Sequence, residues 1–168
     1  MNVLSWIIFI GCCIKTGSIL YSFFVSLFIN PEAAKNLYME LNLSALKDFD
    51  MVYYCIMMTL VIAMWTLKAL MFYYVVKIFT KINFEQPFSS NVAGLIKNIS
   101  SCAVVIGMIG LIADKLSEGL SAQGVIPTNL SEFIGGGGEF LFFAGIIFII
   151  SLVFKRGIEI QSENELTV

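Results

Sequence analysis

The sequence contains no histidine, and only 13% of its 168 residues are charged. The absence of histidine removes the most common general base at neutral pH and the most common zinc ligand. There is also no G-x-S-x-G segment, and no serine has a histidine to activate it. We therefore expect no enzymatic activity, no metal site and no cofactor.

Cysteine is scarce as well, and none of the four cysteines forms a C-x-x-C pair of the redox or zinc type. Cys12, Cys13, Cys55 and Cys102 all lie inside long apolar runs, which favours buried, small hydrophobic residues. The alternative is a quinone-linked thiol oxidoreductase, but the adjacent Cys12 and Cys13 are too strained a pair for that chemistry.

Basic residues are too few for a nucleic-acid-binding face. The formal net charge is −2 and the sequence pI is about 5.1, so we expect no direct contact with nucleic acid. By contrast, 58% of the residues are hydrophobic and the mean hydropathy is +0.89, whereas soluble proteins have about 25% charged residues. This composition indicates that the lipid bilayer is the main environment of the chain.

Four long apolar runs are separated by short polar segments, and a spanning helix needs roughly 20 residues. The last run reaches that length when Gly135 to Gly137 join it. The first run is a retained anchor rather than a secretory signal, because it lacks a basic start and carries Lys15 in its middle. The sequence predicts an all-α, polytopic membrane protein with one domain, 1–168. Its spans are expected at about 3–29, 51–79, 92–114 and 136–154, followed by a tail at 155–168.

The segments between the spans carry helix and turn signals. Asn30, Pro31 and Glu32 provide a cap, a proline at the first helical position and an acid in the first turn. A short external helix is therefore expected through about Leu41. Before the third span, Pro87 ends any helix and Ser89 or Ser90 can cap the next one. Gly135 to Gly138 predict a flexible or closely packed helix entry, with a substrate gate as the alternative.

Lysine and arginine are more frequent in the loops on one side of the predicted spans, and cytoplasmic loops carry this excess. We therefore predict a cell-membrane protein with both termini in the cytoplasm. One side carries Lys77, Lys81, Lys97, Lys155 and Arg156, and the other carries Lys35, Lys47 and Lys115.

Polar residues within the apolar runs are the candidates for function, because each is costly in a membrane. They are Lys15, Lys68, Glu139 and Asp114. Two stripes of small residues recur at helical spacing, and such stripes allow membrane helices to approach closely. We predict that the first and third spans pack together through these stripes. The stripe residues are Gly11, Ser18, Ser22 and Ser26 in the first span, and Ser100, Ala103, Gly107 and Gly110 in the third.

Helix rise allows the depth of each charge to be compared. Lys15 lies roughly 16 Å from the start of its span and Glu139 roughly 22 Å from the same side, whereas Asp114 lies roughly 33 Å away. We therefore predict that Lys15 pairs with Glu139 and that Asp114 lies at the outer interface. The alternatives are an ion or proton pathway that uses this pair, or lysines that only fix helix register or extend toward the interface.

The tail carries three glutamates between apolar residues, and Gly157 is expected to end the last helix. With Pro87, Phe88 and Asn91, this tail resembles that of the YoaS-like family, bacterial four-span membrane proteins of unknown function. Their tails end in a segment similar to Leu-Gln-x-Glu-Asn-Asp-Leu-Thr-Val. In this chain Ile160 replaces the usual leucine and Glu165 the usual aspartate.

The resemblance implies a membrane partner for a DNA-binding protein, because family members are often found beside small helix-turn-helix regulators. It implies no catalytic residue. The residues that match the family pattern are candidates for a cytoplasmic docking surface. They are Pro87, Phe88, Asn91, Gly157, Gln161, Glu163, Asn164, Leu166, Thr167 and Val168.

The sequence thus predicts a non-enzymatic bacterial membrane protein that senses or regulates through its cytoplasmic loop and tail, in contact with a cytoplasmic regulator protein. One alternative is a small ion or solute transporter that uses Glu139 and Lys15. Another is an immunity protein against a membrane-active toxin.

Overall fold

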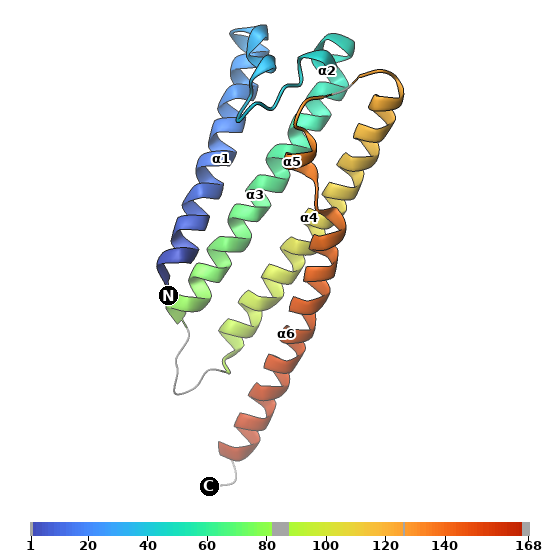
Figure 1. Cartoon of the computed structure of the whole chain (residues 1–168). Coiled ribbons are helices and arrows are strands. Elements are labelled where there is room, and N and C mark those ends of the chain that lie inside the picture. Colours follow the sequence, from blue (N-terminus) through green and yellow to red (C-terminus); the bar gives the residue numbers. More distant parts are fainter. Residues whose placement is uncertain (1, 82–87, 126, 166–168) are drawn as a thin grey trace.

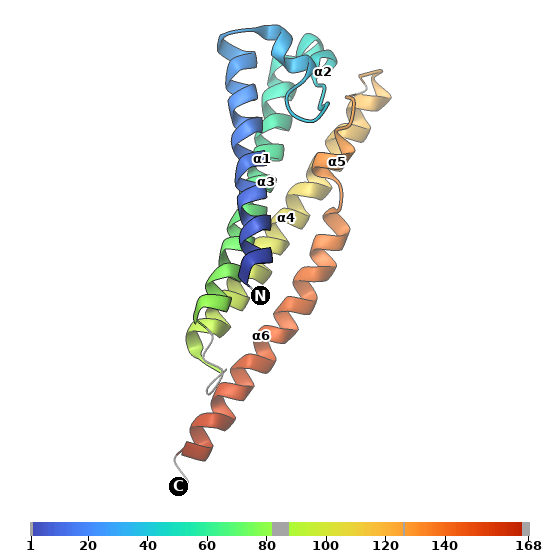
Figure 2. The ribbon, with the colours of Figure 1, turned by 60° about the vertical axis from the view of Figure 1, so that its left-hand side comes forward.

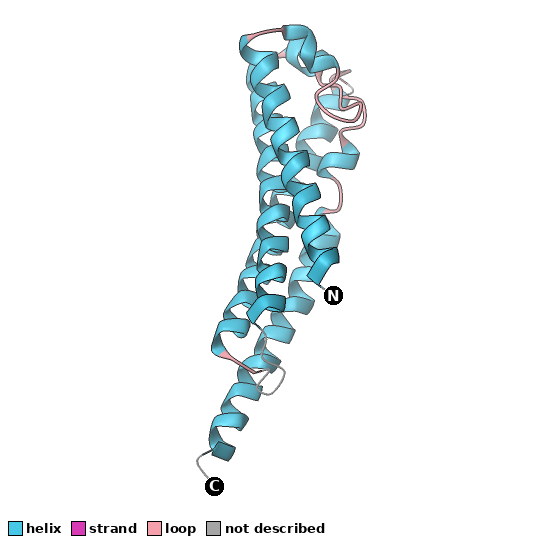
Figure 3. Ribbon diagram, turned by 90° about the vertical axis from the view of Figure 1, so that its left-hand side faces the viewer, coloured by secondary structure: helices cyan, strands magenta, loops and turns pink. Residues whose placement is uncertain are grey.

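The computed structural model describes residues 2–81, 88–125 and 127–165, which form helices and no strand. Long helices run along the molecule, with short helices and loops gathered at one end (Figures 1 and 3). The long helices are α1 (Asn2–Phe28), α3 (Met51–Lys81), α4 (Ser90–Ala122) and α6 (Gly137–Glu165). The short ones are η1 (Pro31–Lys35), α2 (Ser44–Phe49) and α5 (Ser131–Ile134). The predicted all-α fold class is confirmed.

Four helices are long and apolar enough to cross a membrane, but two extend further than expected. α4 continues past Asp114 to Ala122, and α6 continues past Gly157 to Glu165. The prediction that Gly157 ends the last helix is therefore wrong. Pairs of charged residues three apart support both extensions. Lys115 Nζ lies 2.6 Å from the carboxylate of Glu118, and Arg156 lies 2.8 Å from that of Glu159.

The long helices pack in the order α1, α3, α4 and α6, with the most extensive contact between α4 and α6. Figure 2 shows α1 and α3 side by side, with α6 apart from them. α1 packs chiefly against α3 and η1, so the predicted packing of the first and third spans is wrong. The small residues of α4 face α6 instead.

Small residues explain the close approach of α4 and α6. A Cβ added to Gly110 would lie 2.9 Å from the Cα of Gly137, and one added to Gly137 would lie 2.8 Å from the backbone N of Leu111. Ser100 Oγ donates to the carbonyl of Ala144 at 3.0 Å, which joins the same two helices. Only residues without a side chain allow two backbones this close.

The connections α1–α3 and α4–α6 form a packed cap at one end of the helices. Leucines 37, 41, 43 and 46 are buried there. Asn42 and Thr128 join the two connections as an isolated antiparallel bridge, with backbone bonds of 3.2 and 3.1 Å. The cap therefore ties the α1–α3 pair to the α4–α6 pair.

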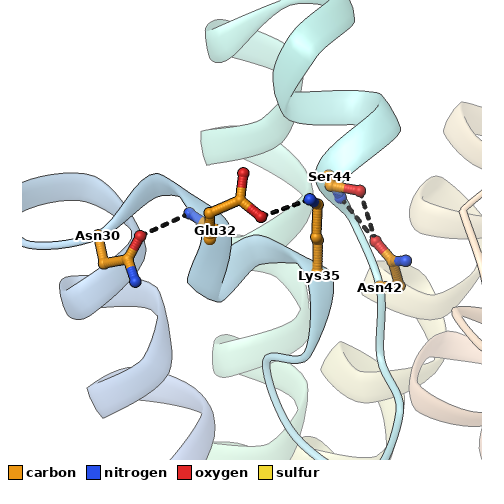
Figure 4. Close-up of polar contacts among 5 residues, drawn as sticks. All are labelled: Asn30, Glu32, Lys35, Asn42 and Ser44. Carbon is orange, nitrogen blue, oxygen red and sulfur yellow. Dashed lines mark hydrogen bonds and ion pairs between the residues drawn. The ribbon is translucent and has the colours of Figure 1, made fainter.

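Polar side chains shape the first connection (Figure 4). The side chain of Asn30 accepts from the backbone N–H of Glu32 at 3.0 Å, as predicted for the cap residue. The ammonium of Lys35 donates to the carboxylate of Glu32, which raises the pKa of Lys35. The helix predicted to reach Leu41 ends at Lys35, because Asn36 leaves the helical conformation with φ of −148°. Met39 and Glu40 then turn the chain with φ of 44° and 64°.

At the cap end, α1 and α3 share a buried polar contact. The hydroxyls of Ser26 and Tyr54 lie 2.5 Å apart, and both side chains are buried. Lys47 in α2 donates to the carbonyl of Ser26, and its Nζ lies 5.7 Å from the centroid of the Tyr54 ring. These contacts hold α2 over the ends of both helices.

Candidate functional site

Lys15 and Lys68 converge on one tryptophan near the middle of α1 and α3. The Nζ of Lys15 lies 3.8 Å from the centroid of the Trp65 ring, and the Nζ of Lys68 lies 4.5 Å from the same ring. Lys15 also lies 4.4 Å from the ring of Phe133, and Lys68 lies 5.1 Å from that of Phe140. We call these five residues the lysine cluster.

Three parts of the chain position the cluster. Trp65 and Lys68 are three residues apart in α3, so helical geometry places them on one face. Phe133 belongs to α5 and Phe140 to α6, and the chain turns between them at Gly136, where φ is 90°. The glycine run therefore brings both phenylalanines to the lysines, in addition to its role as a closely packed helix entry.

Lys15 does not pair with Glu139 as predicted. The ion pairs among the described residues all join side chains three positions apart, and none includes Lys15, Lys68 or Glu139. The depth comparison placed Glu139 within reach, but Lys15 is held over aromatic rings instead. A cation over an aromatic face is stabilised by about 0.5 to 2 kcal/mol, so rings replace the expected carboxylate.

Glu139 is exposed and lines a groove of about 300 Å³ between α3 and α6. Met71, Phe72, Phe140 and Phe143 form the rest of this groove, which is mostly apolar. Phe140 also belongs to the lysine cluster, so the groove and the cluster share this residue.

Asp114 lies nearer the cap, on the boundary between the apolar and polar parts of α4. With Ser117, Glu118, Ser121 and Ser131 it lines a pocket of about 430 Å³. The placement of Asp114 at the outer interface stays a prediction.

The predicted packing residues fall into two groups. In α4, Ser100, Ala103, Gly107 and Gly110 are buried. Of the four predicted packing residues in α1, only Ser26 is buried. Ser18 and Ser22 are half-buried and Gly11 is exposed, with no atom within 4 Å of an added Cβ. The stripe in α4 thus makes a tight helix contact, whereas most of the stripe in α1 does not.

The described docking candidates lie at the end opposite the cap, where Phe88 contacts α6. Phe88 packs on α6, with its ring 5.2 Å from that of Phe154 and within 2.6 Å of a Cβ added to Gly157. Asn91 is exposed in the first turn of α4, after Ser89 caps that helix through the N–H of Val92.

The remaining candidates lie along α6 or beyond the described part of the chain. Gln161 and Glu163 belong to the last turns of α6, half-buried and exposed respectively. The side chain of Asn164, together with Pro87, Leu166, Thr167 and Val168, lies outside the described residues.

Sequence reasoning missed the aromatic members of the cluster. Trp65, three residues before Lys68, is a signal that was present in the sequence, because this spacing puts a ring beside the ammonium. Nothing in the sequence indicated Phe133 or Phe140, because their position depends on the turn at Gly136. Among the described residues, no group of three His, Cys, Asp or Glu side chains could hold a metal ion.

The four apolar helices define a multi-pass membrane protein. The family model described as "Protein of unknown function (DUF2975)" matches residues 26–168, so the chain belongs to this family. No curated protein and no solved structure matches the chain.

Proposed function

We propose that this protein is a non-enzymatic membrane protein that regulates a cytoplasmic protein by binding it at the end opposite the cap. The observation that carries the proposal is the contact of Phe88 with Gly157, which joins the start of α4 to the last part of α6. We call Phe88, Asn91, Gly157 and Ile160 the tail surface.

The shape and exposure of the tail surface support docking. α6 projects beyond the other long helices at its C-terminal end (Figures 1 and 3). Ile160 is 47% exposed and Phe88 is 38% exposed. Apolar side chains on a helix that leaves the apolar region can bind the groove of a partner protein.

Charge favours a basic partner. After Arg156 the remaining charged residues of the chain are all glutamates, at positions 159, 163 and 165. An acidic segment is repelled by an anionic membrane surface, so it is presented to the cytosol. A small DNA-binding regulator has the basic surface that would complement it.

The transporter alternative is less favoured than it was from the sequence. It depended on Lys15 and Glu139 acting as a pair, and these residues form no ion pair with each other. The immunity alternative has no feature of the described residues in its favour.

Site-specific photocrosslinking in the native cell tests the proposal. A photoreactive residue at Ile160 or Asn91 should give an adduct with one and the same basic protein. The control is Met39, which is 67% exposed in the cap. Replacing Phe88 by Ala should weaken the adducts at both positions. Equal adducts at Met39, or different partners at Ile160 and Asn91, would show that the tail surface is not a single docking site.

Labelling in intact cells tests the orientation separately, on a cysteine-free background. A cysteine at Ser162 should be protected from an impermeant thiol reagent, and one at Gln123 should be labelled. Gln123 is exposed beside Gly124, whose φ of 84° makes the glycine itself a poor place for a cysteine. Labelling at Ser162 would place the tail outside and remove the proposed partner.

A further inference from the structure

The lysine cluster places two positive charges at one ring, and neither ammonium group forms an ion pair with a described residue. The Nζ atoms of Lys15 and Lys68 lie 3.8 and 4.5 Å from the centroid of Trp65. An aromatic face attracts a cation but carries no net charge. Two ammonium groups beside one ring repel each other, and the repulsion is strong where the surroundings are apolar.

No acidic residue of the described chain pairs with these ammonium groups. Glu132 is the acid whose charge acts on Lys15, but it is exposed and forms no ion pair with it. Glu139 is also exposed and forms none. The positive charge of the cluster therefore has no internal partner within the described residues.

The indole adds a third donor. The Nε1 of Trp65 is buried and has no hydrogen-bond partner among the described residues, which is rare for a buried polar atom. Ammonium and indole N–H groups donate and do not accept. The cluster thus offers donors alone, and the complementary group is an anion that only accepts, such as a carboxylate.

Depth and the adjoining groove indicate what carries this carboxylate. Lys15 is 13 residues from either end of α1, Asn2 and Phe28, which is about 20 Å of helix on each side. An unpaired charge is costly at this depth, so an anion that binds here is expected to be carried on a largely apolar molecule and to be held by the lysines. The apolar groove that includes Phe72 and Phe143 adjoins the cluster at Phe140, whose ring centroid lies 5.1 Å from the Nζ of Lys68.

We propose that Lys15 and Lys68 bind the carboxylate of a membrane-soluble fatty acid, whose chain lies in the groove between α3 and α6. The carboxylate accepts from both ammonium groups, and the chain contacts Phe72 and Phe140. The site does not involve the tail surface, so this proposal and the docking proposal can fail independently.

Quenching of tryptophan fluorescence by a brominated fatty acid tests the site in the purified, full-length protein. The chain has two tryptophans, so Trp6→Phe leaves Trp65 as the reporter. Dibromostearic acid should quench Trp65 with a saturable curve, whereas its methyl ester, which lacks the charge, should bind at least about tenfold more weakly.

Substitutions at the lysines identify the binding groups. Lys15→Met and Lys68→Met should each weaken binding of the acid by about tenfold or more, the size of one charge-assisted hydrogen bond. Lys15→Arg keeps the charge and should restore most of the affinity. The matched control is Lys77→Met, because Lys77 also lies in α3, with its Nζ 4.6 Å from the Tyr73 ring, and it should leave binding unchanged. Circular dichroism and elution volume show whether each variant is folded.

Three results would overturn the proposal. Equal quenching by the acid and its methyl ester would show binding of the chain without its charge. Equal affinities in folded Lys15→Met and unsubstituted protein would show that the anion lies elsewhere. Saturable quenching by brominated phosphatidylglycerol at the affinity of the free acid would assign the anion to a lipid headgroup instead of a fatty acid.

Discussion

The α4–α6 contact and the α1–α3 contact differ in the size and polarity of their side chains. α4 and α6 meet through glycines, with Gly110 and Gly137 too close to accept a Cβ. α1 and α3 meet through large and polar residues, including Trp65 and the pair of Ser26 and Tyr54. At these glycines the first contact has no room for a ligand, whereas the second holds Lys15 and Lys68, which form no ion pair with another described residue.

We infer from this difference that the α4–α6 contact contributes mainly to stability and that the lysines of the α1–α3 contact serve binding. In a membrane, close packing of small residues is a main source of helix association. A lysine at the centre of a span is instead costly, by about 2.5 to 3.5 kcal/mol on insertion scales. The aromatic rings around Lys15 and Lys68 offset part of that cost. We therefore expect substitutions at the glycines to lower stability and substitutions at the lysines to spare it.

The largest effect is expected at the tight contact. Gly110→Ala should lower the free energy of unfolding in mixed detergent by about 2 kcal/mol, because the new Cβ pushes on the backbone of Gly137. Gly94 is the control in the same helix, since no atom lies within 4 Å of an added Cβ there. Gly94→Ala should leave that free energy unchanged or raise it by up to about 1 kcal/mol. Similar losses from both would mean that α4 and α6 do not meet at Gly110.

A smaller effect is expected at the polar end of the α1–α3 contact. Tyr54→Phe removes the hydroxyl that lies 2.5 Å from Ser26 Oγ and should lower the free energy of unfolding by about 1 kcal/mol. Tyr53→Phe, at an exposed neighbour, should change it by less than about 0.5 kcal/mol. In a double-mutant cycle with Ser26→Ala, a coupling near zero would contradict the hydrogen bond.

The smallest effect is expected where α2 rests on this contact. Lys47→Met removes the bond to the carbonyl of Ser26 and should lower the free energy of unfolding by about 0.5 kcal/mol. Lys35→Met breaks only the exposed pair with Glu32 and should have no measurable effect. If Lys35→Met lowered the free energy of unfolding as much as Lys47→Met, the loss could not be assigned to the bond between Lys47 and Ser26.

The membrane class and the four spans could be predicted from the sequence, because spanning requires long apolar runs whatever their neighbours are. Helix ends were predicted less well. Gly157 lacks a side chain because the Phe88 ring covers it, not because the helix ends there. Such a contact between distant segments leaves no local signal.

The candidate site was predicted only in part, because it too depends on contacts between distant segments. Lys15 and Lys68 stand out in apolar runs, so their importance could be read directly. Their partners could not, because depth along parallel helices does not say which helices are neighbours. The order α1, α3, α4, α6 puts Trp65, not Glu139, beside Lys15.

The central claim is that the lysines of the α1–α3 contact serve binding and not stability. The most direct test is the free energy of unfolding of the double variant Lys15→Met, Lys68→Met, measured in mixed detergent beside Gly110→Ala. We predict that the double variant is at least as stable as the unsubstituted protein, because two costly charges are removed. A loss of about 2 kcal/mol or more, as large as that of Gly110→Ala, would contradict the claim and make the lysines part of the packing.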